Sequence, residues 1–563
     1  MNISSHHAVY RFGLNLLLLL GLVLPGCSGD RRDAGEFIVH GGTILTMDPA
    51  RPSVDAFLVR EGRIAALGPA EQLFADHPQA RSCDLGGRVV LPGFIDSHTH
   101  VHELGHDRRK VDLTGTMTVA GMVARFRNAI PEPEPGGWLI GSGWDEGEWA
   151  TIGYPDRAAL DAAFPENPVW CESLHGFAGF ANGRALAAAG IDRETPDPEP
   201  GRILRRADGE ATGTLLTRAQ ALVTDHIPPP TLEETKEILL LGLNLMAREG
   251  VTSVHEAGLN RQQTLAFSEL RAEGRLPIRV YGMIRVTETD LLEEWFARGP
   301  LIDPEAVFTV RAIKIFYDGS LGSRTALMRE PYSDDPAAAA PTIEHSPEEF
   351  RGFLERAAET GFQVVVHCIG DEANDRYLAE TERIAAARPG LDHRWRNEHA
   401  QIVLPDYYTR AAEVGLISSM QTSHAVLDMG WAGARVGPER IRHGYAWRSM
   451  LEAGVPLIVN SDLPAVPWKP VETLYFGVTR QNLAGEPAGG WFPRQRLTVD
   501  ETLRAMTVRS AWAAFQEDQL GSLEAGKFAD FVELDRNPYR VAPAELKDLR
   551  VVATWVGGRK LAF

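Results

Sequence analysis

The stretch LPGFIDSHTH, residues 91–100, is an apolar run that ends in two histidines separated by one residue. In a β-strand the side chains of residues i and i+2 point to the same face, so His98 and His100 would lie together, roughly 7 Å apart at their Cα atoms. Two imidazoles placed in this way can converge on one metal ion. Paired surface histidines produce the same pattern, so its meaning depends on the rest of the chain.

Seven further apolar runs follow this stretch. They are GVTSVHEAG (250–258), PIRVYGMIRV (277–286), VRAIKIFYDG (310–319), GFQVVVHCIGD (361–371), RWRNEHAQIV (394–403), GLISSMQTSH (415–424) and VPLIVNSD (455–462). Helical patterns separate most of them; one begins at Ser346-Pro347, a cap followed by proline at the first helical position. Eight strands that alternate with helices predict an α/β fold, a (β/α)8 or TIM barrel.

Both ends of the chain are rich in short strands punctuated by glycine. We therefore expect residues 36–90 and 516–563 to form one small composite β-sandwich domain beside the barrel of residues 91–515. The segment at about 101–235 lies between the first two strands and contains many Gly, Pro and Trp residues. It is expected to be a large insertion over the barrel mouth, where such loops set specificity.

The N-terminus has the pattern of a targeting signal. An arginine precedes an apolar run over residues 12–24, which is shorter than the ~20 residues that span a bilayer. The run ends in LPGC at Cys27, which resembles a bacterial lipobox. The resemblance implies a signal peptide at 1–26, a lipidated Cys27, a tether at 27–35, and an envelope location on the periplasmic side, at the outer membrane if the organism has one. The alternative is a plain secretory signal with an incidental cysteine.

Composition excludes several classes of protein. The 563 residues are 44% hydrophobic and 24% charged, which is typical of a globular protein and not of a mainly disordered or multi-span membrane protein. The net charge of −19 without a basic run lacks the electrostatic pattern of a nucleic-acid binder. Four cysteines do not make a disulfide framework. Membrane contact is thus expected through the lipid only, and the sequence leaves open whether the chain forms a homodimer.

Polar residues end several of the predicted strands. His367 follows three valines, Glu398-His399 ends the sixth strand, and Asp462 ends the eighth. Active sites of (β/α)8 barrels lie at the carboxyl ends of the strands. Three imidazoles or carboxylates suffice for a catalytic zinc site, and a larger set indicates two ions. Lys314 lies inside the fourth strand, where an ammonium must be paired or neutralised; from the residues alone, pairing with an acid such as Asp318 explains it.

Six stretches occur in the order found in the amidohydrolase superfamily: LPGFIDSHTH, IKIFYDGSLGSRTAL, VVVHCIGDEAND, NEHAQIV, IVNSDLP and GSLEAGKFADFVELD. The chain resembles its amidohydrolase-3 branch, which includes N-substituted formamide deformylases. The resemblance implies two divalent ions, Zn²⁺, the first held by His98, His100 and Asp462 and the second by His367 and His399. It also implies that Lys314, carboxylated by CO₂, bridges the two ions, and that Asp462 acts as general base and then acid. The implied reaction is hydrolysis of a non-peptide carbon–nitrogen bond in a small amide, open or cyclic.

Four residues near these motifs are candidates for substrate binding: Trp144, His175, Arg324 and His424. Three have a structural alternative, namely a core position for Trp144, a structural role for His175 and an ion pair with an acid such as Asp318 for Arg324. The function has alternatives too. They are an esterase, lactonase or dipeptidase-like hydrolase on the same ions, a mononuclear isomerase or deaminase, and a non-catalytic surface lipoprotein that binds a ligand.

Overall fold

The computed structural model describes residues 35–563 apart from 146–153, 175, 339–340 and 465. The expected signal peptide, Cys27 and nearly all of the expected tether lie outside the described residues. Within that part of the chain, no helix combines the length and the apolar character needed to cross a membrane.

Eight parallel strands form the predicted barrel. They are β8 (Phe94–Thr99), β15 (Val251–Leu259), β16 (Arg279–Arg285), β17 (Phe308–Phe316), β18 (Gln363–Cys368), β19 (Arg396–His399), β20 (Ile417–Gln421) and β21 (Leu457–Asn460). Each pairs with the next in sequence order, and a single parallel bridge between Thr99 and Leu463 brings the last beside the first. Val364, Val365 and Val366 are all fully buried, as expected for strands covered on both faces. All eight strands overlap the runs expected from the sequence.

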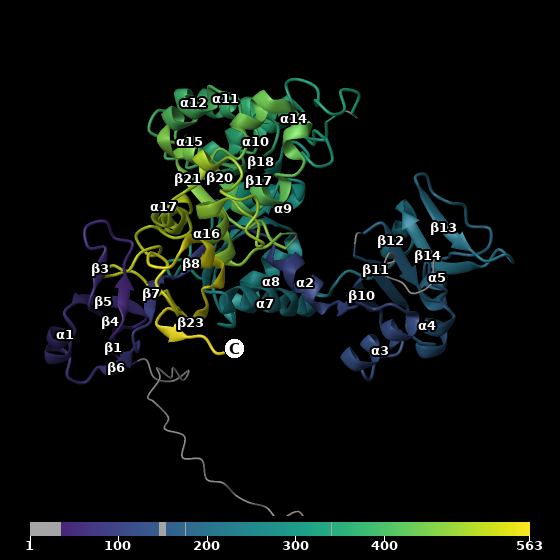
Figure 1. Cartoon of the computed structure of the whole chain (residues 1–563), viewed down its shortest axis with the longest axis horizontal. Coiled ribbons are helices and arrows are strands. Elements are labelled where there is room, and N and C mark those ends of the chain that lie inside the picture. Colours follow the sequence, from purple (N-terminus) through teal and green to yellow (C-terminus); the bar gives the residue numbers. More distant parts are fainter. Residues whose placement is uncertain (1–34, 146–153, 175, 339–340, 465) are drawn as a thin grey trace, which may run out of the picture.

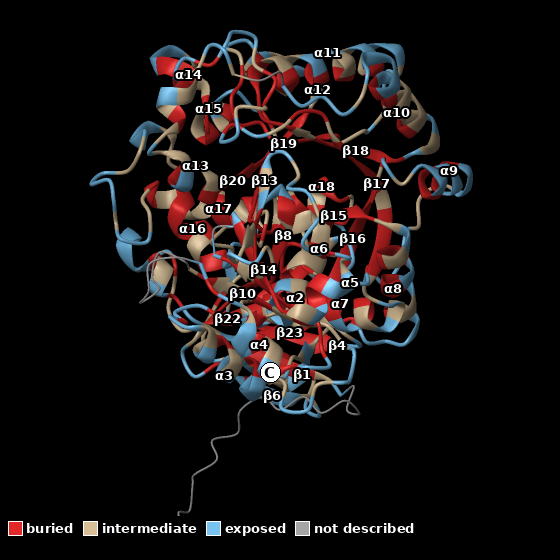
Figure 2. Cartoon of the chain, turned by 90° about the vertical axis from the view of Figure 1, so that its right-hand side faces the viewer, coloured by how far each residue is buried: buried red, intermediate tan, exposed pale blue. Residues whose placement is uncertain are grey.

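Helices cover the outside of the barrel, with their buried sides turned toward the strands (Figure 2). They are α7 (Leu232–Arg248), α8 (Arg261–Ala272), α9 (Thr289–Arg298), α10 (Pro347–Thr360), α11 (Asp371–Ala387), α12 (Tyr407–Val414), α13 (Thr422–Asp428), α14 (Ala432–Arg440), α15 (Trp447–Glu452), α16 (Pro470–Thr479), α17 (Val499–Ala505) and α18 (Val508–Ala513). α10 begins as predicted, because the Ser346 side chain accepts the N–H of Glu349 and proline occupies the first turn.

The two chain ends form one β-domain, as expected. One sheet contains β5 (Arg63–Gly68), β4 (Ala56–Arg60), β1 (Phe37–His40) and β6 (Arg81–Asp84). The other contains β24 (Arg559–Lys560), β23 (Val551–Val556), β22 (Phe531–Leu534), β7 (Val89–Pro92), β2 (Thr43–Leu45) and β3 (Ser53–Val54). The antiparallel pair β7–β22 joins residues from opposite ends of the chain, and between the sheets Phe531 packs against Phe57 and Trp555.

The segment after β8 begins with α2 (Val101–Arg109) and continues as a separate lobe. The lobe has a sheet of β9 (Val111–Asp112), β10 (Leu139–Trp144), β11 (Val169–Ser173), β12 (Ala178–Ala181), β13 (Gly201–Arg205) and β14 (Ala211–Thr217), with α3 (Val119–Ala129), α4 (Ala158–Ala163), α5 (Gly183–Ala188) and α6 (Ala221–Thr224). Its two hydrophobic cores share no residue with the barrel core. The lobe stands apart from the barrel, beyond α2 (Figure 1). α2 packs closely on α7. The approach requires glycine at position 105, because a Cβ there would lie only 1.9 Å from the Ile238 carbonyl oxygen.

Candidate metal centre

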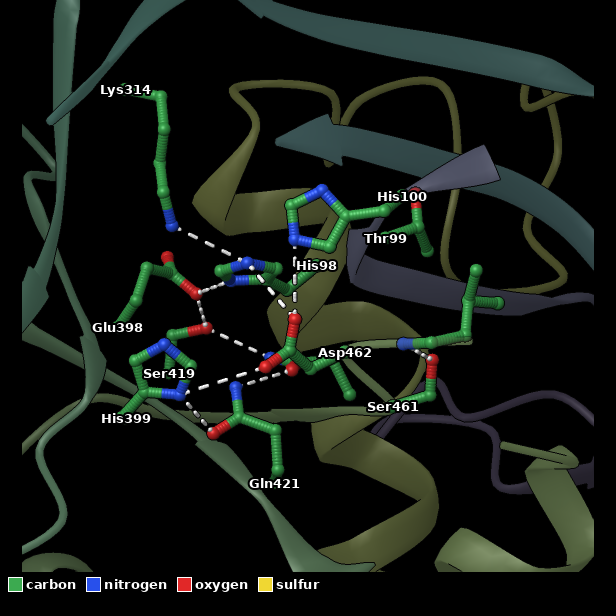
Figure 3. Close-up of polar contacts among 12 residues, drawn as sticks. His98, Thr99, His100, Lys314, Glu398, His399, Ser419, Gln421, Ser461 and Asp462 are labelled. Atoms are coloured by element: carbon green, nitrogen blue, oxygen red, sulfur yellow. Dashed lines mark hydrogen bonds and ion pairs between the residues drawn. The ribbon is translucent and has the colours of Figure 1, made fainter. Parts of the chain in front are cut away.

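Three of the predicted ligands meet at the carboxyl ends of β8 and β21. The Nε2 atoms of His98 and His100 lie 3.5 and 3.3 Å from Oδ1 of Asp462 (Figure 3). One ligand atom from each of the three residues lies within 4.8 Å of the others. The Asp462 N–H donates to the His98 carbonyl at 3.0 Å, which holds Asp462 at a positive φ of 58°. Such strained backbone is tolerated where a side chain must be aimed into a site.

A second group shares Asp462. Its other oxygen, Oδ2, lies 3.6 Å from Nε2 of His424 and 3.9 Å from Nδ1 of His399. The rings of His399 and His424 are stacked, with centroids 5.7 Å apart, and the three residues again present ligand atoms within 4.8 Å of one another. His424, expected only as a substrate contact, therefore lies among the potential ligands.

His367 lies beside this second group. Its ring centroid is 4.4 Å from that of His399, and its Nε2 is 3.2 Å from the carbonyl oxygen of Gly319. Neither three-residue group among the described residues contains His367. Its role as a ligand stays a prediction, and it requires the contact with Gly319 to be released or the other ring nitrogen to be used.

Lys314 is fully buried on β17, and its Nζ lies 3.3 Å from Nε2 of His98. Burial disfavours the ammonium and lowers the pKa of Lys314 to about 8. No carboxylate among the described residues lies within ion-pair distance of Nζ. Asp318, the partner that the residues alone suggested, instead accepts the backbone N–H groups of Leu327, Ile369 and Gly370. Lys314 is therefore a largely desolvated amine next to His98, one of the candidate metal ligands.

The protonation states of the histidines and Asp462 suit a metal site. Burial, with a further contribution from Lys314, lowers the pKa of His98 to about 4, so its imidazole is neutral. Burial alone would raise the pKa of Asp462, but the neighbouring histidines outweigh it and hold that pKa well below its usual range. Burial would lower the pKa of His100 as well, but its hydrogen bond to Asp462 and the charges of nearby carboxylates outweigh burial and raise that pKa. A neutral imidazole such as that of His98 beside an ionised carboxylate belongs to the donor set that binds Zn²⁺ and similar divalent ions. The residues present therefore fit the ions that the sequence implied.

Two buried glutamates belong to this site, although sequence reasoning assigned them no role. Glu398 on β19 accepts a hydrogen bond from Nδ1 of His98. Glu256 on β15 accepts the backbone N–H of Val101 at 2.9 Å and the hydroxyl of Thr99 at 3.1 Å, and so holds the chain on both sides of His100. The available signal was a carboxylate inside a predicted core strand, which is costly unless it is paired.

The other described substrate candidates, Trp144 and Arg324, make contacts within the protein. Trp144 is fully buried in the inserted lobe, where its Nε1 donates to the Cys171 carbonyl at 3.1 Å, which favours the core alternative over a place in a pocket wall. Arg324 forms a bidentate pair with Asp334 at 2.9 and 3.1 Å, so its guanidinium is already held by a carboxylate and its role in substrate binding is not supported. His175 lies outside the described residues.

Comparisons with known proteins agree with this geometry. A family model described as "Amidohydrolase family" matches residues 81–562. Protein LONG AFTER FAR-RED 3 of Arabidopsis thaliana is 32% identical over 543 residues, covering 93% of this chain and 91% of that protein. N-substituted formamide deformylase of Arthrobacter pascens is 28% identical over 548 residues, covering 93% and 97%. The crystal structure of an uncharacterized metal-dependent hydrolase from Pyrococcus furiosus has a TM-score of 0.75 and 27% identity, covering 90% of this chain and 100% of that one.

Proposed function

The chain belongs to the amidohydrolase family, as a metal-dependent hydrolase with a (β/α)8 barrel, and we propose that it cleaves a non-peptide carbon–nitrogen bond in a small amide. The observation that carries the proposal is the position of Asp462. One of its oxygens faces His98 and His100, and the other faces His399 and His424. The similarity to an N-substituted formamide deformylase along nearly the whole of both chains supports an amide as the substrate.

We propose a separate role in hydrolysis for each group of the site. When bound, two divalent ions, which we propose to be Zn²⁺, lower the pKa of water and polarise the substrate carbonyl. Asp462, ionised and buried between the two histidine groups, accepts the proton of the attacking water and delivers it to the leaving nitrogen. The neutral imidazole of His98 presents Nε2 to the same space without adding charge.

Lys314 is proposed to bridge the two ions after carboxylation. Its neutral amine attacks CO₂, a nitrogen–carbon bond forms, and one proton leaves, so that the product is an anionic carbamate. A lowered pKa and the lack of an acidic partner among the described residues both support this step, because they favour the nucleophilic amine. The carbamate also removes the cost of keeping an ammonium inside an apolar strand.

The location of the protein is proposed from its N-terminus. The LPGC motif supports lipidation of Cys27 and an anchor at the periplasmic side of the envelope. Incorporation of radiolabelled fatty acid into the wild-type chain, absent from Cys27→Ser, would support it. Equal labelling of both chains would remove Cys27 as the anchor.

Metal content and substrate range together test the function. The purified full chain is loaded with Zn²⁺ in bicarbonate buffer, and the ions per chain are counted for wild type and Lys314→Ala. Near two ions, falling to one or none in the variant, are expected. The loaded protein is then offered N-substituted formamides, cyclic amides, lactones and dipeptides. Turnover of an amide that stops on chelation supports the proposal, whereas turnover of lactones alone would replace it with an esterase.

A further inference from the structure

A buried chain of hydrogen bonds that does not include Asp462 also joins the two histidine groups. It runs from Nδ1 of His98 to Nδ1 of His399 through four side chains on β19, β20 and β21, namely Glu398, Ser419, Asn460 and Gln421. All six residues are at most 5% exposed. Figure 3 shows most of its contacts as dashed lines.

The direction of each hydrogen bond follows from the first. Glu398 is held as a carboxylate, because Arg396 donates from Nε to its Oε1 at 2.8 Å and Nη2 lies at the same distance. A carboxylate only accepts, so the Ser419 hydroxyl donates its proton to Oε2 at 2.6 Å. The Ser419 oxygen, its proton used, must accept from the next member, which is the Asn460 amide at 2.8 Å.

The same logic reaches the second histidine. With its Nδ2 directed at Ser419, Asn460 presents Oδ1 to the Gln421 amide, which donates at 2.7 Å. Gln421 then has only its carbonyl oxygen left for His399, whose Nδ1 lies 2.8 Å away. Nδ1 of His399 must therefore carry the proton. Nδ1 of His98 carries its proton for the parallel reason, since it contacts the Glu398 carboxylate directly.

We propose that Glu398, Ser419, Asn460 and Gln421 are positioning residues that fix His98 and His399 in the same tautomer, with Nδ1 protonated and Nε2 left to bind metal. The inference rests on the proposed function only in that these histidines hold the ions. It assigns Nε2 of His399 as the ligand atom, although Nδ1 is the nitrogen found 3.9 Å from Asp462. The opposite tautomer would direct an N–H group at a cation and leave the Gln421 oxygen without a donor.

A measurement on the unmutated chain tests the tautomers directly. Metal-free protein with ¹⁵N-labelled histidine is studied by long-range ¹H–¹⁵N correlation, and the signals of His98 and His399 are assigned from His98→Asn and His399→Asn. The Nδ1–H tautomer is expected for both rings. An Nε2–H tautomer at either ring would overturn the proposal, whether or not the enzyme acts on an amide.

Substitutions of Ser419 and Asn460, in the middle of the hydrogen-bond chain, test whether that chain orients the histidines without changing either histidine. Ser419→Ala removes the link between Glu398 and Asn460, and Asn460→Asp replaces the donor facing Ser419 with an acceptor. Both are expected to weaken Co²⁺ binding to the metal-free chain by about 10–100-fold, the usual cost of losing a partner that orients a ligand.

Ser253→Ala is the matched control, because Ser253 is buried on β15 and its hydroxyl has no hydrogen-bond partner among the described residues. It should bind Co²⁺ like wild type. Folding of each variant is checked by circular dichroism. Unchanged Co²⁺ affinity in folded Ser419→Ala and Asn460→Asp would refute the proposed positioning role of the hydrogen-bond chain. If those variants do not fold, the tautomers measured on wild type decide the question. Absence of amide turnover with the expected tautomers and affinities would refute the proposed function alone.

Discussion

Replacing Lys314 by methionine should stabilise the metal-free protein while destroying its metal centre. Methionine keeps most of the volume of the side chain and removes the buried charge. The pKa of Lys314 is lowered from 10.5 to about 8, a difference of about 2.5 units. At 1.36 kcal/mol per unit, the buried ammonium costs about 3 kcal/mol at pH 7. Loss of the contact with Nε2 of His98 destabilises the variant by about 1 kcal/mol. The free energy of unfolding is therefore expected to rise by about 2 kcal/mol in total.

The gain depends on pH in a defined direction. Between about pH 8 and pH 10.5 the unfolded chain binds a proton at this lysine that the folded chain does not. Stability of the wild type relative to Lys314→Met therefore rises with pH across that window, and the advantage of the variant shrinks. At pH 7 both states of the wild type are protonated and the full cost of the buried charge is felt.

The assay is thermal unfolding in chelator and CO₂-free buffer from pH 7 to pH 9.5. At roughly 2 °C per kcal/mol, Lys314→Met should melt about 4 °C higher at pH 7, with the gap closing as pH rises. Zn²⁺ and bicarbonate should then raise the melting temperature of the wild type far more than that of the variant. A variant that melts lower than wild type at pH 7, or a gap independent of pH, would refute the idea that Lys314 is an uncompensated buried amine.

Three further expectations follow from the same structure. Asp462→Asn should lower turnover of the best amide by about 10²–10⁴-fold, measured with saturating metal, whereas a loss below tenfold would assign proton transfer elsewhere. Asp303 is buried; burial alone would raise its pKa, but Arg271 and backbone N–H groups lower it to about 2. Asp303→Asn should therefore remove about 2 kcal/mol of stability above pH 4, seen as a flatter acid denaturation curve between pH 4 and pH 2 than that of wild type. Trp144→Phe should lower the free energy of unfolding of the lobe by about 1–3 kcal/mol and leave KM within twofold of wild type. A tenfold rise in KM with unchanged stability would instead indicate that Trp144 lines the substrate pocket.

The barrel could be predicted from the sequence because its strands are buried on both faces. A run such as Val364–Val366 has no polar alternation and can only be a core strand or part of a buried helix, and its short length favours the strand. The histidines and Asp462 were found because they end such runs, at the edge where parallel strands present their carboxyl ends. Only the structure shows that the Nε2 atoms of His98 and His100 lie 3.3–3.5 Å from Oδ1 of Asp462.

Other parts of the site could not be predicted, for physical reasons. Glu398 adjoins His399 in the sequence, but its partner His98 lies 300 residues away, and no local pattern shows which buried acid meets which ring. Trp144 lies in GSGWDEGEW, where the sequence left both a pocket wall and a core position open, and only the folded lobe shows the indole in a core with residues of β9, β11, β12, α3 and α4. His424 begins no motif, and only the turn from β20 into α13 directs it at Asp462.

The pairing of β7 with β22 has a consequence for synthesis of the protein. The strand at residues 89–92 leaves the ribosome more than 400 residues before its partner at 531–534. Until then its edge and the apolar face of its sheet, including Val90, lack their cover. A nascent or truncated chain therefore cannot complete the β-domain, and a chain that stops before residue 531 should be a substrate for chaperones and proteases even though it contains every proposed metal ligand.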